Sequence, residues 1–176
     1  MKATLEKTGR FTVDVATTPP GKSPKEAWDK FRPDFSMYDV VLSNYNGNPW
    51  PEDVNKGLEK FVSGGGGLVI IHAANNAFEG WVEYNKMIGL GWRSNNNFGD
   101  RITVNDDGNV VRTPKGEGIT AGHGPEHEFK IVVRDAEHPV TKGLPKEWMH
   151  AKHELYHGQR GPAENMHILA TAFSAT

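Results

Sequence analysis

The sequence predicts an α/β fold in which parallel strands are covered by helices on both faces. Residues 38–43 (YDVVLS) and 68–71 (LVII) are apolar runs of the kind found in strands that are buried on both sides. Between them, residues 51–62 carry apolar side chains at helical spacing, and four glycines follow at 64–67. A strand, a helix and a second strand in this order favour parallel pairing through a right-handed crossover.

Further elements are expected in the first half of the chain. Gly9 can end a helix as a C-cap, because glycine accepts a left-handed backbone. Alternation of apolar and polar residues predicts a strand, and proline-rich polar sequence predicts a loop. The expected elements are a helix end at residues 1–8, a short strand at 11–15, a loop at 17–36 with one helical turn at 24–31, and a helix at 79–87.

The pattern changes after Gly91, where short strands and loops are expected. Asp107-Gly108 lies between two alternating runs and predicts a β-hairpin. A loop rich in glycine and histidine follows at residues 113–129. Two strands, at 129–135 and 166–173, and a short helical segment at 145–149 complete the chain. No internal repeat is visible, so we expect one domain over residues 1–176.

Both ends of the sequence are expected to be incomplete. Residues 1–8 read as a helix without an N-cap or a preceding strand, and the chain stops just after the strand-like run at 168–174. An absent first strand would leave a central edge of the sheet unpaired, which favours association into a homo-oligomer. Any signal peptide would then be hidden, so the location stays open, with the cytoplasm favoured.

Composition excludes several classes of function. A net charge of -2 and an isoelectric point near 6.4 give no electrostatic basis for binding nucleic acid or acidic membranes. No run of 18 apolar residues is present, so no transmembrane helix is expected. The sequence contains no cysteine, which excludes disulfides and a thiol nucleophile. No nucleotide cofactor is expected.

Residues 153–157 (HELYH) match H-E-x-x-H, the motif of zinc proteases. In those enzymes both histidines bind zinc from one long helix, and the glutamate acts as general base. Here Gly158 follows at once and Gly-Pro comes at 161–162, so no long helix can continue. A zinc protease is therefore not expected. Glu154 and Tyr156 alternate with an apolar residue and should point the same way from an extended segment.

His72 is the first candidate functional residue. It directly follows the strand at 68–71, and ligand sites of open parallel sheets form outside the carboxyl ends of the strands. In α/β hydrolases the turn at this place holds the nucleophile, but histidine gives no support to serine or cysteine acyl chemistry. His72 could be a metal ligand, an acid or base, or a hydrogen-bond donor. The alternative is a structural histidine that fixes the turn.

His123 and His127 form a second candidate pair in the stretch HGPEH. Their spacing would suit a helix, but Gly124-Pro125 argues against one. From an extended loop both side chains can still reach one site, and the alternative is a solvated polar loop. The other histidines, in turns or at strand ends, are expected to be structural: His138, His150 and His167.

Three stretches in combination resemble the ThuA-like (trehalose utilisation) family: residues 44–93, 122–145 and 153–174. The resemblance implies a flavodoxin-like fold similar to class I glutamine amidotransferases, a three-layer sandwich with a mostly parallel sheet and an inserted β-hairpin. It also implies that the amidotransferase cysteine is absent, which agrees with His72 at the turn. The family is associated with bacterial metabolism of trehalose and of keto-sugar or glycoside derivatives.

The resemblance also implies which residues form the site. The family motif is the E-L-Y of residues 154–156, so His153 creates the protease-like match by coincidence. Members normally have an initial strand and a later glycine-rich turn that this sequence lacks. The residues that match the family motifs and are expected to gather above the sheet are His72, Asn75, Asn76, His123, His127, Glu154 and Tyr156.

The leading hypothesis is an enzyme that acts on a small-molecule carbohydrate, as a hydrolase or another sugar-modifying enzyme. Asn75, Asn76 and Tyr156 can form hydrogen bonds with sugar hydroxyls. Aromatic faces for the sugar ring are offered by Trp50, Trp81 and Trp92, each of which can equally be a core residue. The alternative is a non-catalytic sugar-binding or regulatory module on the same fold. An amidotransferase or acyl hydrolase is disfavoured by the missing cysteine and G-x-S-x-G.

Two mechanisms stay open for the enzyme. Glu154, His72 or His123 could act as a general acid or base. Alternatively, a divalent metal such as zinc could polarise a carbonyl or activate water. Imidazole and carboxylate ligands suit this ion. The expected ligands are His72, His123, His127 and Glu154.

Overall fold

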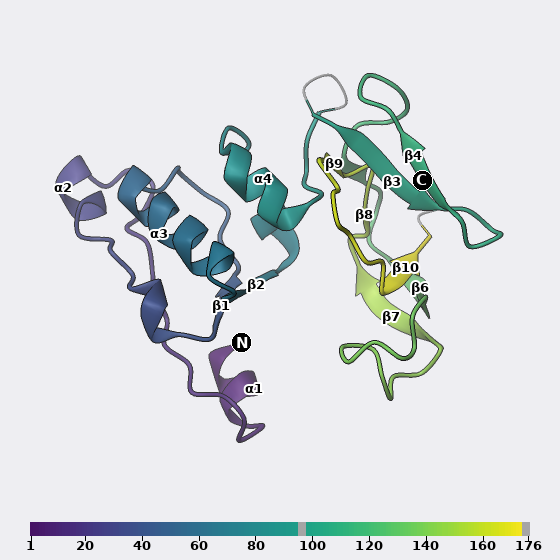
Figure 1. The fold of residues 1–176 in the computed structure, drawn as a ribbon, viewed down its shortest axis with the longest axis horizontal. Helices are drawn as coiled ribbons and strands as arrows, with labels where there is room; N and C mark the ends of the chain where they lie inside the picture. Colours follow the sequence, from purple (N-terminus) through teal and green to yellow (C-terminus); the bar gives the residue numbers. More distant parts are fainter. Residues whose placement is uncertain (95–97, 174–176) are drawn as a thin grey trace.

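A computed structural model describes residues 1–94 and 98–173, and the chain divides into two parts (Figure 1). Residues 1–92 form a part that contains the α-helices of the described chain and one pair of parallel strands. Residues 98–173, as far as they are described, form a part made of antiparallel strands. The fold is therefore mixed α/β, as the sequence predicts.

The first part is built around a strand–helix–strand unit. Its elements are α1 (Lys2–Glu6), α2 (Lys25–Trp28), the 3₁₀ helix η1 (Phe35–Met37), β1 (Val40–Ser43), α3 (Glu52–Ser63), β2 (Gly67–Ile70), the 3₁₀ helix η2 (His72–Asn76) and α4 (Val82–Ile88). β1 and β2 are parallel, with Val40 opposite Gly67 and Ser43 opposite Ile70. α3 is the crossover between them, so the unit that the apolar runs predict is confirmed.

The core of this part lies under α3. Leu58 and Val54, one helical turn apart, are 1% and 3% exposed, and Phe35 of η1 completes the buried cluster. The first turn of α3 is acidic, which suits the positive end of the helix dipole, and the helix ends at Gly64. No helix in the described chain is long and apolar enough to cross a membrane.

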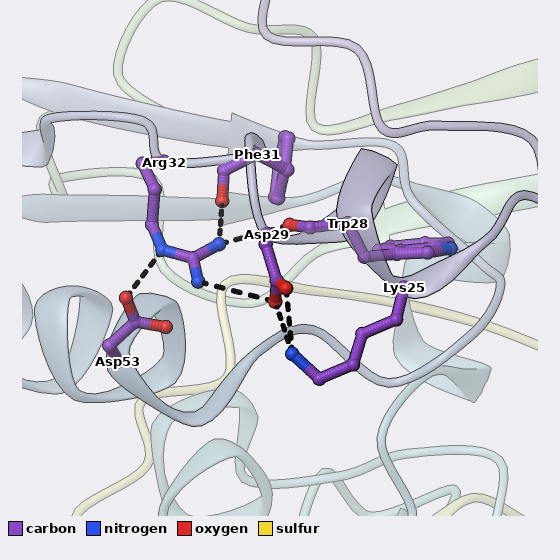
Figure 2. A network of polar contacts seen from close by, with 6 residues as sticks. All are labelled: Lys25, Trp28, Asp29, Phe31, Arg32 and Asp53. Carbon is purple, nitrogen blue, oxygen red and sulfur yellow. Dashed lines mark hydrogen bonds and ion pairs between the residues drawn. The ribbon is translucent and has the colours of Figure 1, made fainter.

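A polar network fixes the segment after α2 against the start of α3 (Figure 2). The guanidinium of Arg32 donates to the main-chain carbonyls of Trp28 and Phe31 at 3.0 and 2.8 Å. The same group forms an ion pair with Asp53 in the first turn of α3. Because these pairs are exposed, each contributes only about 0–1 kcal/mol, and the network orients the segment more than it stabilises the fold.

The second part consists of short strands in three sheets. Its strands are β3 (Asp100–Val104), β4 (Val110–Thr113), β5 (Gly122–His123), β6 (His127–Val133), β7 (Glu147–His153), β8 (Tyr156–His157), β9 (Arg160–Gly161) and β10 (Ala170–Ala172). The sheet orders are β4-β3-β9, β10-β6-β7 and β5-β8, and every pair in them is antiparallel. The predicted hairpin is confirmed, since β3 and β4 pair across the turn that holds Gly108 with φ +83°.

The two parts are joined by main-chain contacts between residues 89–91 and 160–163. Gly91 and Arg160 exchange main-chain hydrogen bonds of 2.9 and 3.0 Å, and Ala163 donates to the Gly89 carbonyl at 3.0 Å. The backbones approach so closely that a Cβ on Gly161 would collide with the Gly89 carbonyl. Arg160 is fully buried beside these contacts. These main-chain contacts, called the joint below, therefore fix the relative position of the two parts.

Three predictions of local structure differ from the structure. Residues 145–149 were expected to be helical, but β7 begins at Glu147, because pairing with β6 outweighs helix propensity. Residues 11–15 form no strand, since no neighbouring strand pairs with them. The sheet is not mostly parallel in the described chain, where parallel pairing is limited to β1 and β2. The strand-like run at 168–174 contains β10, and its last residue, Ser174, lies outside the described residues.

Candidate functional site

His72 lies where β2 has ended and η2 begins, at the carboxyl end of a parallel strand. Its φ is +46°, in the left-handed region that residues with a side chain seldom adopt. Ala74 N–H donates to the Ile71 carbonyl at 3.0 Å and closes the turn. A backbone of this kind costs about 1–3 kcal/mol, and such residues cluster at functional sites.

The pairing of β5 with β8 brings residues of the second part to His72. In this pair His123 lies opposite Tyr156. Glu154 lies between the end of β7 and the start of β8, two residues before Tyr156. Both side chains reach His72, as the extended reading of E-L-Y predicts. Residues far apart in sequence are thus gathered where the two parts meet.

The carboxylate of Glu154 lies between two imidazoles. Its Oε2 is 3.6 Å from His72 Nε2, and its Oε1 is 3.7 Å from His123 Nε2. The Glu154 side chain is 30% exposed and each imidazole 38%, so the group is open to a ligand from solvent. The distances exceed those of good hydrogen bonds, so the carboxylate and both imidazoles keep hydrogen-bonding capacity for a ligand that approaches from solvent.

Aromatic rings surround this carboxylate. The Tyr156 ring centroid lies 4.5 Å from that of His72 and 4.7 Å from that of Trp92. His153 packs edge-on against His72 at 5.1 Å. Flat apolar faces next to a carboxylate are the combination that binds a sugar ring, whose C–H groups stack while its hydroxyls form hydrogen bonds.

The phenol of Tyr156 stays protonated near neutral pH. Burial raises its pKa above the ordinary value, and the negative charge of Glu154 raises it further. A side-chain hydrogen bond from Asn76 acts in the opposite direction, because it stabilises the phenolate. Tyr156 can therefore donate a hydrogen bond to a ligand from its neutral hydroxyl.

Asn75 and Asn76 lie on η2, next to His72. The side-chain Oδ1 atoms of both residues are buried and have no hydrogen-bond partner among the described residues. A buried acceptor without a donor costs roughly 1–3 kcal/mol unless something binds it. These two oxygens are therefore acceptors without a donor, and a ligand hydroxyl would reach them only if the atoms that cover them moved.

Two further predicted residues are not brought to this cluster by any contact in the described chain. His127 lies at the start of β6, where its Nδ1 is 2.9 Å from the Pro125 carbonyl and its ring packs edge-on against Phe129. Trp50 lies in the first part and packs edge-on against Phe78 with ring centroids 4.9 Å apart. It contributes to the aromatic packing beside the core.

The remaining aromatic and histidine candidates have local contacts. Trp81 donates from Nε1 to Glu59 at 2.7 Å, which fits the core alternative. His150 stacks on Phe129, and His167 lies 2.9 Å from Asp135. His138 accepts a hydrogen bond from the Val140 main chain.

The residues 153–157 do not form a zinc-protease helix, as predicted, because β7 ends at His153 and β8 begins at Tyr156. Sequence reasoning did, however, treat His153 as incidental, whereas its ring lies against His72. It also did not single out Arg93, which is 1% exposed directly beneath η2. Nothing in the sequence separates Arg93 from the surface arginines.

The residues of this site suit a metal by the chemistry of their donor atoms, imidazole nitrogen and carboxylate oxygen. In the part of the chain that the structure describes, no group of three or more His, Asp or Glu side chains is close enough to hold an ion. Two donors on a tetrahedral zinc lie about 3.4 Å apart, given zinc–ligand distances near 2.1 Å. The imidazole–carboxylate distances of 3.6 and 3.7 Å involve different oxygens of Glu154, so the side chains would have to rearrange to meet at one ion.

The chain was compared with known proteins. The model of the family described as ThuA, trehalose utilisation, matches residues 2–176. The crystal structure of a ThuA-like protein from Parabacteroides merdae ATCC 43184, at 1.75 Å resolution, is 42% identical with a TM-score of 0.89. The match covers 97% of this chain but 60% of that chain, so the sequence spans less than two thirds of that relative. No curated protein matches. The family model and this relative show that the chain belongs to the ThuA (trehalose utilisation) family.

Proposed function

We propose that this protein acts in bacterial carbohydrate metabolism on a sugar or glycoside, related to trehalose or a keto-sugar, at the cluster of His72, His123, Glu154 and Tyr156. The observation that carries the proposal is the Glu154 carboxylate between the Nε2 atoms of two imidazoles. The description of the family as trehalose utilisation supports the substrate class.

The groups around Glu154 suit recognition of a sugar. The Glu154 carboxylate accepts hydrogen bonds from hydroxyls and the Tyr156 phenol donates one, while the side chain of Asn76 forms a hydrogen bond with that phenol. Trp92 and Tyr156 form an angled aromatic wall, with ring planes 73° apart, against which a sugar ring can pack. Asn75 lies on the same turn, with its side-chain oxygen buried.

The same groups suit acid–base chemistry. Glu154 would act as general base and take a proton from a sugar hydroxyl or from water. A neighbouring imidazole, His72 or His123, would stabilise the reacting charge or return the proton to the leaving oxygen. The reaction class is a hydrolysis or another modification at a carbon–oxygen centre. A positioned group of this kind contributes roughly 10²–10⁴ in rate.

A metal-assisted form of this chemistry is the second candidate, and it is supported by the donor types, two imidazoles next to one carboxylate. His72, His123 and Glu154 would hold the ion. When bound, a divalent metal would supply Lewis acidity towards a carbonyl or water. Tyr156 would keep its role in binding the sugar.

We also propose that the β1–α3–β2 unit belongs to a flavodoxin-like, three-layer arrangement. The parallel pairing of β1 with β2 and the position of His72 at the strand's carboxyl end support this architecture. A homo-oligomer is proposed as well, and light scattering on the purified protein would test it.

The test of function is a panel of trehalose, other glycosides and keto-sugars, with binding measured by calorimetry and products by NMR. Turnover of one sugar supports the enzyme. Binding without turnover, unaffected by a chelator, supports a sugar-binding module instead. Glutamine hydrolysis without sugar binding would replace both with an amidotransferase-type activity.

A further inference from the structure

Arg93 is a buried arginine held entirely by neutral groups. Its side chain lies between η2 and α4 and is 1% exposed. The guanidinium donates to Asn85 Oδ1 at 2.8 Å from Nε, and to main-chain carbonyls from Nη1 and Nη2. Those carbonyls belong to Asn75 (3.0 Å), Asn76 (3.2 Å), Ala77 (2.7 Å) and Trp92 (3.0 Å).

Among the described residues Arg93 forms no direct ion pair with a carboxylate, although a buried cation normally needs one. Burial lowers the pKa of Arg93 and the negative charge of Glu79 opposes this, and an arginine stays charged throughout the physiological range. An apolar side chain in its place would avoid the cost of a buried charge but would leave Asn85 Oδ1 and the main-chain carbonyls without these donors. The free energy that offsets the cost of the buried charge must come from the hydrogen bonds that Arg93 donates.

Three of the acceptors are successive carbonyls of the turn that begins at His72. Three carbonyls in a row can all point at one group only if the backbone of η2 is fixed in one conformation. Arg93 occupies the main-chain acceptors of Asn75 and Asn76, and the side-chain oxygens of the same two residues are buried without a donor.

We infer that Arg93 is a positioning residue of the candidate site, which fixes η2 so that His72 is presented to a hydroxylated ligand and the side-chain amides of Asn75 and Asn76 keep their places in the turn. The planar fork of five donors is what makes arginine fit this role, and lysine cannot reproduce it. This inference rests on the proposed function for the nature of the ligand.

Neighbouring residues hold Arg93 itself in place. Asn85 of α4 donates from Nδ2 to the carbonyls of Glu79 and Trp81 at 3.0 and 2.8 Å, so its Oδ1 is directed at Arg93. Tyr84, also on α4, donates from its hydroxyl to the Ala74 carbonyl at 2.8 Å. α4 thus fixes η2 both directly and through Arg93.

The test is Arg93→Ala with chemical rescue, and Arg160→Ala is the matched control. Arg160 is also fully buried and also donates to main-chain carbonyls, those of Gly99, Pro114 and Ile119 among them, but none lies on η2. For the sugar identified in the panel, Arg93→Ala should weaken affinity about tenfold or more, since several hydrogen bonds are lost. Millimolar guanidinium, but not methylammonium, should restore the affinity. The inference would be overturned if folded Arg160→Ala lost affinity for the sugar while Arg93→Ala kept it. It would also be overturned if guanidinium did not restore the affinity of Arg93→Ala.

Two measurements keep the test independent of folding and of the sugar. If Arg93→Ala does not fold, Arg93→Lys keeps the volume and charge, and it should fold yet bind the sugar more weakly. If the wild type binds no sugar, the proposed function fails. NMR of the ligand-free protein then still shows whether Arg93 positions η2. The His72 imidazole and Asn76 side-chain signals should then shift in Arg93→Lys and stay in place in Arg160→Lys. Unshifted signals in Arg93→Lys would show that Arg93 does not position the turn.

Discussion

His123 and Tyr156 lie opposite each other in the β5–β8 pair, and their rings are inclined by only 19° with centroids 5.8 Å apart. Because side chains alternate along an extended segment, Glu154 points to the same side as Tyr156. The short pairing of β5 with β8 thus places His123, Glu154 and Tyr156, the residues that the second part supplies to the site.

Glu154→Gln should abolish most turnover while leaving the fold intact. Turnover should fall by roughly 10²–10⁴, because glutamine cannot accept the proton. Stability should change little, since an exposed ion pair contributes about 0–1 kcal/mol. Activity on the sugar and the midpoint of thermal unfolding are the measurements. The control is Glu147→Gln, which should retain activity. It removes an exposed carboxylate on β7 that forms an ion pair with Lys130 on β6.

Metal content should distinguish the two mechanisms. If the ion is held as proposed, protein purified without an affinity tag should contain near-stoichiometric zinc or another divalent ion by elemental analysis. His72→Ala and His123→Ala should each lose it, because each removes one donor. His150→Ala, whose ring stacks on Phe129, should retain it. Well-folded wild type that binds no added divalent ion would leave general acid–base chemistry as the mechanism.

Asp135 should make the protein sensitive to acid. Main-chain N–H donation from Glu137 holds the pKa of Asp135 below its ordinary value, and the N–H of His138 and the His167 imidazole add to this, while burial opposes it. A carboxyl whose pKa is lowered on folding stabilises the protein above its unfolded value, about pH 4. This contribution is lost as the pH falls through the folded value.

Asp135→Asn should therefore unfold at a lower temperature than wild type at neutral pH, and the difference should shrink as the pH falls below about 4. Thermal unfolding followed by circular dichroism across this range is the measurement. Asp106→Asn, an exposed change in the β3–β4 turn, serves as control. A difference that is constant with pH would contradict the assignment to the charge of Asp135.

Gly161→Ala should weaken the joint between the two parts. The added Cβ would collide with the Gly89 carbonyl, which is main chain and cannot move aside freely. Overpacking of this kind costs typically about 1–3 kcal/mol. The free energy of unfolding in urea is the measurement. Gly80→Ala, where an added Cβ meets nothing within 4 Å, should be close to neutral.

The elements with strong local signals were predictable from the sequence. α3 has a regular apolar stripe, an acidic first turn and a glycine stop, and the structure confirms it within one or two residues. The position of His72 followed from one rule about the carboxyl ends of parallel strands. The common orientation of Glu154 and Tyr156 followed from strand alternation.

The features that depend on distant pairing were not predictable. Residues 147–153 contain good helix formers, yet they are β7 because β6 offers a partner. Whether His127 or His153 approaches His72 is set by how β7 pairs with β6, which no local pattern encodes. The burial of Arg93 and Arg160 contradicts the usual place of arginine at the surface, and it follows only from carbonyls that the fold gathers around each one.

The left-handed backbone of His72 places conformational strain at a residue of the candidate site. Glycine adopts φ near +46° without the roughly 1–2 kcal/mol penalty that a side chain incurs there. His72→Gly should therefore relieve this strain, but it also increases the entropy of the unfolded chain and removes the ring contacts with Tyr156 and His153. Variants at this turn that are selected for thermostability should therefore be screened for sugar turnover at the same time.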